Sequence, residues 1–324
     1  MPRVRVSSSA RLHVGFQNLS LSRERLYGGV GVSLAEPRTT VTAEPAETVR
    51  CDDDLVDRYA GIACELLGVD GAAVDVETRL PRHVGLGSGT QLALATLAAV
   101  AVAHDRDARV RKRAPSMERG GRSGVGVAAF ESGGIIVDAG HPTERFTTAP
   151  PDAGDWTVPA VLARHPIPEA WRFLLVLPDA TVGRSGDDED ESIRSVVERA
   201  DPSIADELAS LLVQQLLPAA AEGRLDAFGD AIGEFGRLNG AWYADEQGGV
   251  YRPPAGRLID ELRSVPSVRG VGQSSWGPAV YGLTDAARAP QAKRAAREAL
   301  NSAGVDGDVR IVAGTNDGAT VDRR

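Results

Sequence analysis

The chain has 324 residues, of which 42% are hydrophobic, so it is long enough to form two domains around a substantial core. The formal net charge of −9, without a basic stripe carrying interleaved aromatic residues, argues against a nucleic-acid partner. The N-terminus lacks the apolar segment of a secretion signal, and the apolar run from Leu92 to Ala103 is too short to span a bilayer. We therefore expect a cytoplasmic protein without a membrane partner.

The first half of the chain reads mainly as strands around two helices. Alternating apolar residues predict strands over 4–16, 30–34 and 39–45, and a helix is expected over 56–67. A strand over 72–81 then leads into a glycine-rich turn and an apolar helix that ends near Ala103. Residues 126–140 are expected to form two strands joined at 132–134. The proline-rich stretch 143–168 predicts a boundary between domains 1–160 and 161–324.

The second half opens on an apolar strand, Trp171 to Ala180, which an acidic loop over 183–192 follows. Helices are expected near 193–199, 204–221 and 224–238, a strand–turn–strand unit over 268–285, a helix over 286–303 and a last strand over 308–314. Strands and helices mix without strict alternation, which favours an α+β fold. The two cysteines, Cys51 and Cys64, lie far from any histidine cluster, so a zinc site is not expected.

The stretch PRHVGLGSGTQLALA (81–95) has the composition of a phosphate-binding turn. Glycines at 85, 87 and 89 leave room for a phosphate to reach backbone N–H groups, and the helix that follows offers its positive end. Ser88 and Thr90 add hydroxyl groups, and Ser88 is also a candidate metal ligand. A helix entry that holds no ligand is the plainer alternative. Lysine followed by serine or threonine, as in a Walker loop, is missing here.

This turn resembles the phosphate loop of the GHMP superfamily, which includes galactokinase, homoserine kinase and mevalonate kinase. SARLHVGF (9–16) and GVGQSSWGPAVYG (270–282) stand where that superfamily has its first and third motifs. The resemblance runs essentially from end to end. It implies an N-terminal domain like the second domain of ribosomal protein S5 and a ferredoxin-like C-terminal domain.

Kinases of the superfamily carry an aspartate in the middle motif, where it acts as the base for the accepting hydroxyl. Here that motif reads ERGGRSGVGVAAFESGG, and Gly126 stands in place of the aspartate. The nearest downstream carboxylate, Glu131, is expected on a strand. Losing a general base typically costs about 10²–10⁴-fold in rate, so kinase activity is the weaker alternative.

The sequences of these three motifs are similar to those of the β-ribofuranosylaminobenzene 5'-phosphate synthase family. That family joins phosphoribosyl diphosphate to 4-aminobenzoate or 4-hydroxybenzoate and releases diphosphate and carbon dioxide, in methanopterin-type cofactor biosynthesis. The resemblance implies Mg²⁺ as cofactor and a homodimer. The para substituent of the aromatic acid stays open, as does a non-catalytic, metabolite-binding role.

The resemblance and the residue chemistry together suggest roles for individual side chains. Arg11, His13, Arg119 and Gln273 are expected to be catalytic. The candidates for phosphate binding are Gly85, Gly87, Ser88, Gly89, Thr90, Arg122, Ser123 and Gly124. The candidates for substrate binding are Ser274, Ser275, Trp276 and Asn239, with Trp242 and Tyr243 near the same cleft. Ser88 and Glu189 are the candidate metal ligands, and Asp187 and Asp188 are alternatives to Glu189. For each of these the plainer alternative is a solvated loop charge or a core side chain.

Overall fold

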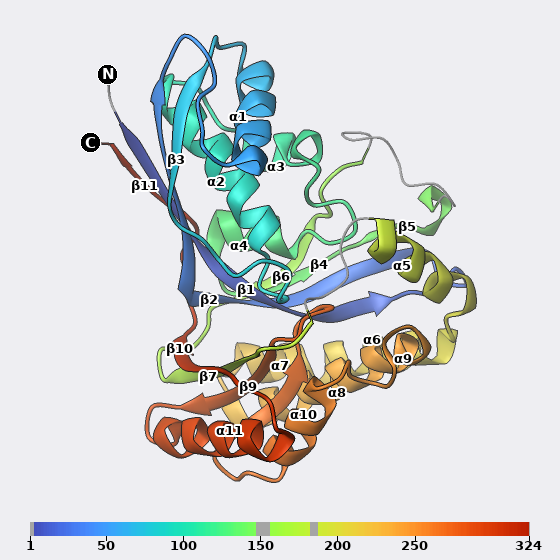
Figure 1. Cartoon of the computed structure of the whole chain (residues 1–324). Helices are drawn as coiled ribbons and strands as arrows, with labels where there is room; N and C mark the ends of the chain where they lie inside the picture. The colour runs from blue at the N-terminus through green and yellow to red at the C-terminus, as the bar shows by residue number, and fades with distance from the viewer. Residues whose placement is uncertain (1–2, 147–155, 182–186, 324) are drawn as a thin grey trace.

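The computed structural model describes residues 3–146, 156–181 and 187–323, and their fold is α+β, as predicted (Figure 1). A seven-stranded sheet has the path β11-β1-β2-β4-β6, with β3 and β5 also paired to β2. Every paired strand of this sheet runs antiparallel to its neighbour. Its strands are β1 (Val4–Asn18), β2 (Arg25–Pro45), β3 (Ala72–Thr78), β4 (Ile135–Asp138), β5 (His141–Pro142), β6 (Val161–His165) and β11 (Thr320–Arg323).

The helices of the first half cover one face of this sheet (Figure 1). They are α1 (Asp54–Leu67), α2 (Ser88–Ala103), α3 (Val110–Arg113), α4 (Val125–Ser132) and the short turns η1 (Pro115–Met117) and η2 (Thr143–Arg145). The prediction of two strands over 126–140 was wrong for its first part. Residues 125–132 form α4, which packs on α2, β1 and β2, so Glu131 lies on a helix and only β4 is a strand.

The second sheet is four-stranded and antiparallel, with the order β10-β7-β9-β8. Its strands are β7 (Trp171–Pro178), β8 (Arg269–Gln273), β9 (Val280–Asp285) and β10 (Gly307–Ala313). The helices of this half are α5 (Asp187–Arg199), α6 (Pro202–Leu211), the π-helix η3 (Leu212–Leu216), α7 (Leu217–Ala221), α8 (Leu225–Trp242), α9 (Ala244–Gln247), α10 (Ala255–Arg263) and α11 (Ala289–Ala303). The predicted helix over 204–221 therefore exists, with a π-turn where Pro218 cannot donate a backbone hydrogen bond.

The largest hydrophobic cluster spans the two halves, and each half has a further cluster of its own. Strands β1 and β2 pass between α2 and α4 on one side and α6 and α8 on the other (Figure 1). Leu12 and Val32 of these strands lie in the same buried cluster as Phe173 of β7 and Phe235 of α8. The C-terminal strand β11 returns to pair with β1. Within the described residues, no helix is both long and apolar enough to cross a membrane.

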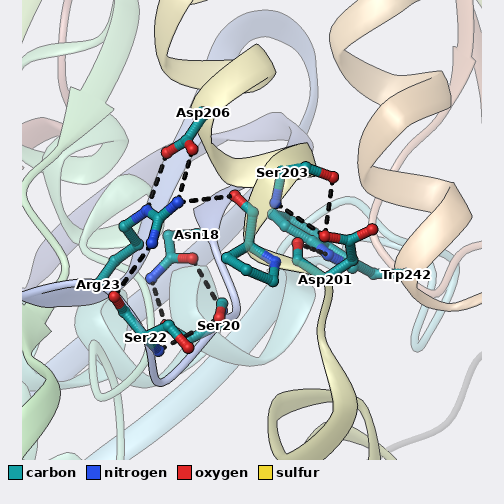
Figure 2. Close-up of polar contacts among 9 residues, drawn as sticks. Asn18, Ser20, Ser22, Arg23, Asp201, Ser203, Asp206 and Trp242 are labelled. Atoms are coloured by element: carbon teal, nitrogen blue, oxygen red, sulfur yellow. Dashed lines mark hydrogen bonds and ion pairs between the residues drawn. The ribbon is translucent and has the colours of Figure 1, made fainter.

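A polar clasp, formed by Arg23 and Asp206, ties the β1–β2 turn to helix α6 (Figure 2). Arg23 Nε donates to Asp206 Oδ1 at 2.8 Å, and Nη2 donates to Oδ2 at 2.5 Å. Asn18 closes the turn itself, because its side chain both donates to and accepts from the backbone of Ser20 at 2.8 Å. The clasp holds the far end of β1 against the second half of the chain.

Candidate active site

Two adjoining cavities form one cleft between the halves of the chain. The larger has a volume of about 590 Å³ and the smaller about 310 Å³. Both are lined by the same six residues where they meet: Arg11, Thr90, Arg119, Glu189, Ser275 and Trp276. The cleft therefore has two compartments around a shared centre.

The predicted phosphate loop lines the smaller compartment. Gly85, Gly87, Ser88, Gly89 and Thr90 all face it. Gly87 has φ +81° and precedes the first residue of α2, and no side chain caps that helix end. A Cβ atom on Gly85 would lie 2.1 Å from the carbonyl oxygen of Ser274, so this position admits only glycine. The uncapped amides and positive end of α2 thus face a hollow suited to an anion.

Arg11 stands on β1 at the junction of the compartments. Its Nη1 donates to the carbonyl oxygen of Gly85 at 2.7 Å, which fixes the guanidinium beside the loop. Burial lowers the pKa of Arg11 to about 10, while the charge of Glu189 acts in the opposite direction. Arg11 therefore keeps its positive charge at neutral pH.

Three buried N–H groups around the cleft have no hydrogen-bond partner among the described residues: Arg11 Nε, Arg119 Nε and Trp156 Nε1. All three residues line the larger compartment. Leaving a buried donor unpaired costs about 1–3 kcal/mol, so such groups usually mark a place where a ligand or water belongs.

Arg119 lies between the compartments, next to the loop. A Cβ atom on Gly89 would lie 3.5 Å from its Cζ, and the guanidinium sits 5.5 Å from the ring centroid of Tyr59 while donating to the Tyr59 hydroxyl. Tyr59 of α1 thereby holds Arg119 over the start of α2. A phosphate bound at the loop would meet Arg119 directly.

His13 takes part in a buried chain of polar contacts. Its Nε2 lies 3.2 Å from Ser123 Oγ, and Ser123 Oγ donates to Asp138 Oδ2 at 2.9 Å. Burial, and after it the charge of Arg11, lowers the pKa of His13 to about 3, so the imidazole is neutral. Gly124 also donates to Asp138 through its backbone at 2.8 Å, and it lines neither compartment.

The residues of the third motif divide between lining the cleft and holding its walls. Ser274 is fully buried; its hydroxyl accepts from the His13 backbone at 3.0 Å and donates to the Gly85 carbonyl at 2.7 Å. Gln273 lines the larger compartment, but its amide contacts the backbones of Arg252 and Ser275 at 2.8 and 2.9 Å. Ser275 and Trp276 line both compartments.

Aromatic side chains surround the larger compartment. Phe16, Trp156, Tyr243 and Trp276 line it, and the rings of Tyr243 and Trp276 meet edge to face with centroids 4.8 Å apart. Asn239 also lines it, and Asn239 Nδ2 donates to the Phe16 carbonyl at 2.6 Å. These rings offer apolar contact to a flat ligand, while the charged side chains of the same compartment offer polar contacts.

Arg122 faces the acidic start of α5. It contacts Glu189 at 3.5 Å and also pairs with Asp190. Burial raises the pKa of Glu189, while Arg122 and then Arg11 act in the opposite direction. The side chains of Asp187 and Asp188, the alternative metal ligands, lie outside those that the structure describes.

Gly126 on α4 lies against the phosphate loop. A Cβ atom here would stand 3.1 Å from Thr90 Cγ2, so a side chain at this position would press against Thr90, which lines both compartments. The carboxylates that line the two compartments, Glu118, Glu189 and Asp190, are each paired with an arginine. A free carboxylate is therefore missing from the lining as far as the chain is described.

Sequence reasoning missed Asp138, Trp156 and the arginines Arg79 and Arg82 of the smaller compartment. Asp138 ends a predicted apolar strand, and its neighbours are glycines and a serine, a weak signal for a buried carboxylate. Trp156 belongs to the proline-rich stretch interpreted as a domain boundary. Neither position carries a pattern that links it to the glycine turn.

Comparisons with known proteins agree with this geometry. The GHMP kinases N terminal domain matches residues 54–134, and the GHMP kinases C terminal domain matches residues 216–302. The solved structure of homoserine kinase from Cytophaga hutchinsonii has a TM-score of 0.69 at 14% identity, covering 99% of this chain and 97% of that one. Phosphomevalonate kinase from Streptococcus pneumoniae has a TM-score of 0.68 at 11% identity, with full coverage of both chains. The two-domain GHMP fold is therefore the fold of this chain.

Two curated relatives are much more similar in sequence. The β-ribofuranosylphenol 5'-phosphate synthase of Methanothermobacter thermautotrophicus is 34% identical over 297 residues, covering 86% of this chain and 88% of the relative. The enzyme of the same name from Archaeoglobus fulgidus is 32% identical over 290 residues, covering 87% and 88%. This chain is an enzyme that belongs to the β-ribofuranosylphenol 5'-phosphate synthase family, within the GHMP kinase superfamily.

Proposed function

We propose that this enzyme joins phosphoribosyl diphosphate to a 4-substituted benzoate and releases diphosphate and carbon dioxide. The observation that carries the proposal is the division of the cleft: a glycine-lined compartment at the start of α2 adjoins an aromatic-lined one, with Arg11 and Arg119 between them. The diphosphate fits the first and the aromatic acid the second. The anomeric carbon then lies at the shared centre.

The curated relatives are named for a phenol product, which favours 4-hydroxybenzoate as the acceptor, with 4-aminobenzoate as the alternative. In this reaction the bond from the anomeric carbon to diphosphate breaks. The ring carbon that bears the carboxylate forms the new carbon–carbon bond, and loss of carbon dioxide restores the aromatic ring. The overall reaction needs no base for a sugar or alcohol hydroxyl, which agrees with glycine at position 126.

The chain supplies the charge stabilisation that this leaving group requires. The uncapped amides of α2, Arg11 and Arg119 all face the place where the diphosphate would gain charge. Preorganised donors of this kind stabilise a developing anion without reorganising during the reaction.

In this proposal Mg²⁺ binds together with the substrate, mainly through the phosphate oxygens of phosphoribosyl diphosphate. The described residues contain no cluster of three or more metal-binding side chains, and Mg²⁺ commonly binds through one or two protein groups plus substrate phosphates. Glu189, which lines both compartments, and Ser88, in the smaller one, are the groups that would hold it. A bound Mg²⁺ would neutralise charge on the diphosphate. The homodimer and the methanopterin-type pathway stay predictions from the family resemblance.

The test is a turnover assay on the purified chain. Protein, Mg²⁺ and phosphoribosyl diphosphate are incubated with carboxyl-labelled 4-hydroxybenzoate or 4-aminobenzoate, and labelled carbon dioxide and diphosphate are measured. We expect equal amounts of both products. The variant Arg119→Ala should lose most of this activity, and Arg297→Ala, exposed on α11, should keep it. If neither benzoate yields carbon dioxide and diphosphate, the proposal is overturned.

A further inference from the structure

The polar chain His13–Ser123–Asp138 fixes which nitrogen of His13 carries its hydrogen. Asp138 is fully buried and accepts from the backbone of Gly124 at 2.8 Å and of Gly140 at 2.9 Å. Burial raises the pKa of Asp138, while hydrogen bonds from Gly140, Gly29, Ser123 and Gly124 lower it. Burial is the largest of these effects, so the pKa of Asp138 is raised overall. A backbone N–H group nevertheless points at each carboxylate oxygen, Gly124 at Oδ2 and Gly140 at Oδ1, and this arrangement favours the ionised form.

With Asp138 ionised, the hydroxyl hydrogen of Ser123 points to the carboxylate. Ser123 Oγ then has only lone pairs left, and it also accepts from the Val125 backbone at 3.2 Å. The neutral His13 ring, 3.2 Å away, must therefore place its hydrogen on Nε2 and donate to Ser123. The other nitrogen, Nδ1, is left as a hydrogen-bond acceptor.

Nδ1 has no hydrogen-bond partner among the described residues, and His13 lines the larger compartment, which also holds the aromatic side chains. The ring meets Phe16 edge to face, with centroids 5.0 Å apart, so it is held at the compartment wall. The neighbouring Arg11, Arg119 and Arg122 offer only donors. Nδ1 is thus a neutral acceptor on a wall that also carries three arginines, and the three carboxylates of the same compartment are each paired with an arginine.

We propose that His13 Nδ1 accepts a hydrogen bond from the para hydroxyl, or para amino group, of the aromatic acid, and that Ser123 and Asp138 are positioning residues for this contact. The assignment rests on the proposed function for the identity of the ligand. A para group that donates to Nδ1 is more electron-rich, and it feeds the ring carbon opposite, which carries the carboxylate. The same contact therefore selects the substrate and favours attack by that carbon.

Binding of two benzoates to a matched pair of variants tests the contact. In His13→Asn the amide can place its oxygen where Nδ1 stands; in His13→Gln the amide reaches the Nε2 position and leaves the Nδ1 position empty. Binding of each benzoate is measured by calorimetry in the presence of Mg²⁺ and diphosphate. Phosphoribosyl diphosphate is left out, so that no turnover occurs. We expect wild type and His13→Asn to bind 4-hydroxybenzoate about tenfold more tightly than 4-methoxybenzoate, and His13→Gln to bind both equally. No preference in wild type, or an undiminished preference in His13→Gln, would overturn the assignment.

The tautomer has its own spectroscopic signature. The chain has five histidines, so ¹⁵N-labelled histidine gives few signals, and the signal of His13 is identified by its loss in His13→Gln. We expect the hydrogen on Nε2 at pH 7 in wild type. We expect a mixture of tautomers in Ser123→Ala and no change in Ser203→Ala, whose hydroxyl is exposed on α6. A hydrogen on Nδ1 in wild type would contradict the inference.

The two proposals fail separately. If the turnover assay yields no carbon dioxide, the proposed function falls. If turnover is normal but His13→Gln keeps the preference for 4-hydroxybenzoate, only the role of His13 falls. Ser123→Ala should lower the preference between the two benzoates several-fold while leaving the unfolding transition cooperative. If Ser123→Ala keeps the wild-type preference for 4-hydroxybenzoate over 4-methoxybenzoate, Ser123 does not position His13.

Discussion

Gly87 shows how a single residue prepares the phosphate site. Its φ of +81° costs a residue with a side chain about 1–2 kcal/mol, and a Cβ atom would lie 3.2 Å from Arg11 Cγ and Nε. Gly87→Val should therefore displace Arg11 and weaken binding of phosphoribosyl diphosphate at least tenfold, measured by calorimetry. Its unfolding free energy should fall by about 1–2 kcal/mol, so the protein stays folded.

Gly61→Val is the matched control, because a Cβ atom on this glycine of α1 meets nothing within 4 Å. We expect it to bind phosphoribosyl diphosphate as wild type does. Wild-type affinity in Gly87→Val would show that the glycine turn does not hold the phosphates.

Gly126 separates the synthase from a kinase. An aspartate here would place its carboxylate beside Thr90, at the cleft that we propose binds two anions. Like charges 4 Å apart repel by about 4 kcal/mol at an effective dielectric of 20, and a quarter of that weakens binding about fivefold. Gly126→Asp should therefore bind phosphoribosyl diphosphate about fivefold more weakly than Gly126→Asn, which has the same shape without the charge.

A latent kinase makes the opposite prediction for Gly126→Asp. The new carboxylate would restore the missing base, and ATP-dependent phosphorylation of an alcohol should rise. Both activities are measured on the same preparation. A gain in kinase turnover would overturn the synthase proposal, whereas loss of synthase turnover without that gain agrees with it.

At the scale of elements, the sequence predicts most of the strands and helices, but it assigns a strand to α4 and a loop to the start of α5, and it misses α10. Val125, Val127 and Phe130 are residues typical of strands, and the glycines around them suggest a hairpin. Tertiary packing decides otherwise, because all three are buried among α2, β1 and β2. The glycine turn and the third motif were predictable because close backbone approach requires glycine. The contact between Ser123 and Asp138 was not, since it depends on how α4 meets β4.

The start of α6 offers a test of an element apart from the cleft. Asp201 caps this helix by accepting from the Ser203 backbone at 2.8 Å (Figure 2). Replacing a capping aspartate by alanine typically costs about 1 kcal/mol. Asp201→Ala should lower the free energy of unfolding in urea by that amount and keep wild-type turnover. Asp230→Ala, exposed on α8, should change stability by less than about 0.5 kcal/mol. Equal effects of the two variants would contradict the capping role.

At the scale of the whole molecule, the halves are joined by a core and by a ligand site. The largest buried cluster takes residues from β1 and β2 as well as from β7 and α8, and the polar clasp adds a second link. The cleft likewise needs both halves: Arg119 comes from the first and Trp276 from the second. Each half also has a buried cluster of its own, but the largest cluster needs residues from both.

We therefore expect the chain to unfold in urea as one cooperative unit. Far-ultraviolet circular dichroism and tryptophan fluorescence should give coincident transitions, since the four tryptophans lie in both halves. Because a ligand in the cleft binds only the folded pair of halves, Mg²⁺ and diphosphate at about 100 times their dissociation constant should raise the free energy of unfolding by about 2.7 kcal/mol. The whole transition should move without splitting. Two separate transitions, or a ligand shift confined to one probe, would show that the halves fold independently and that the cleft belongs to one of them.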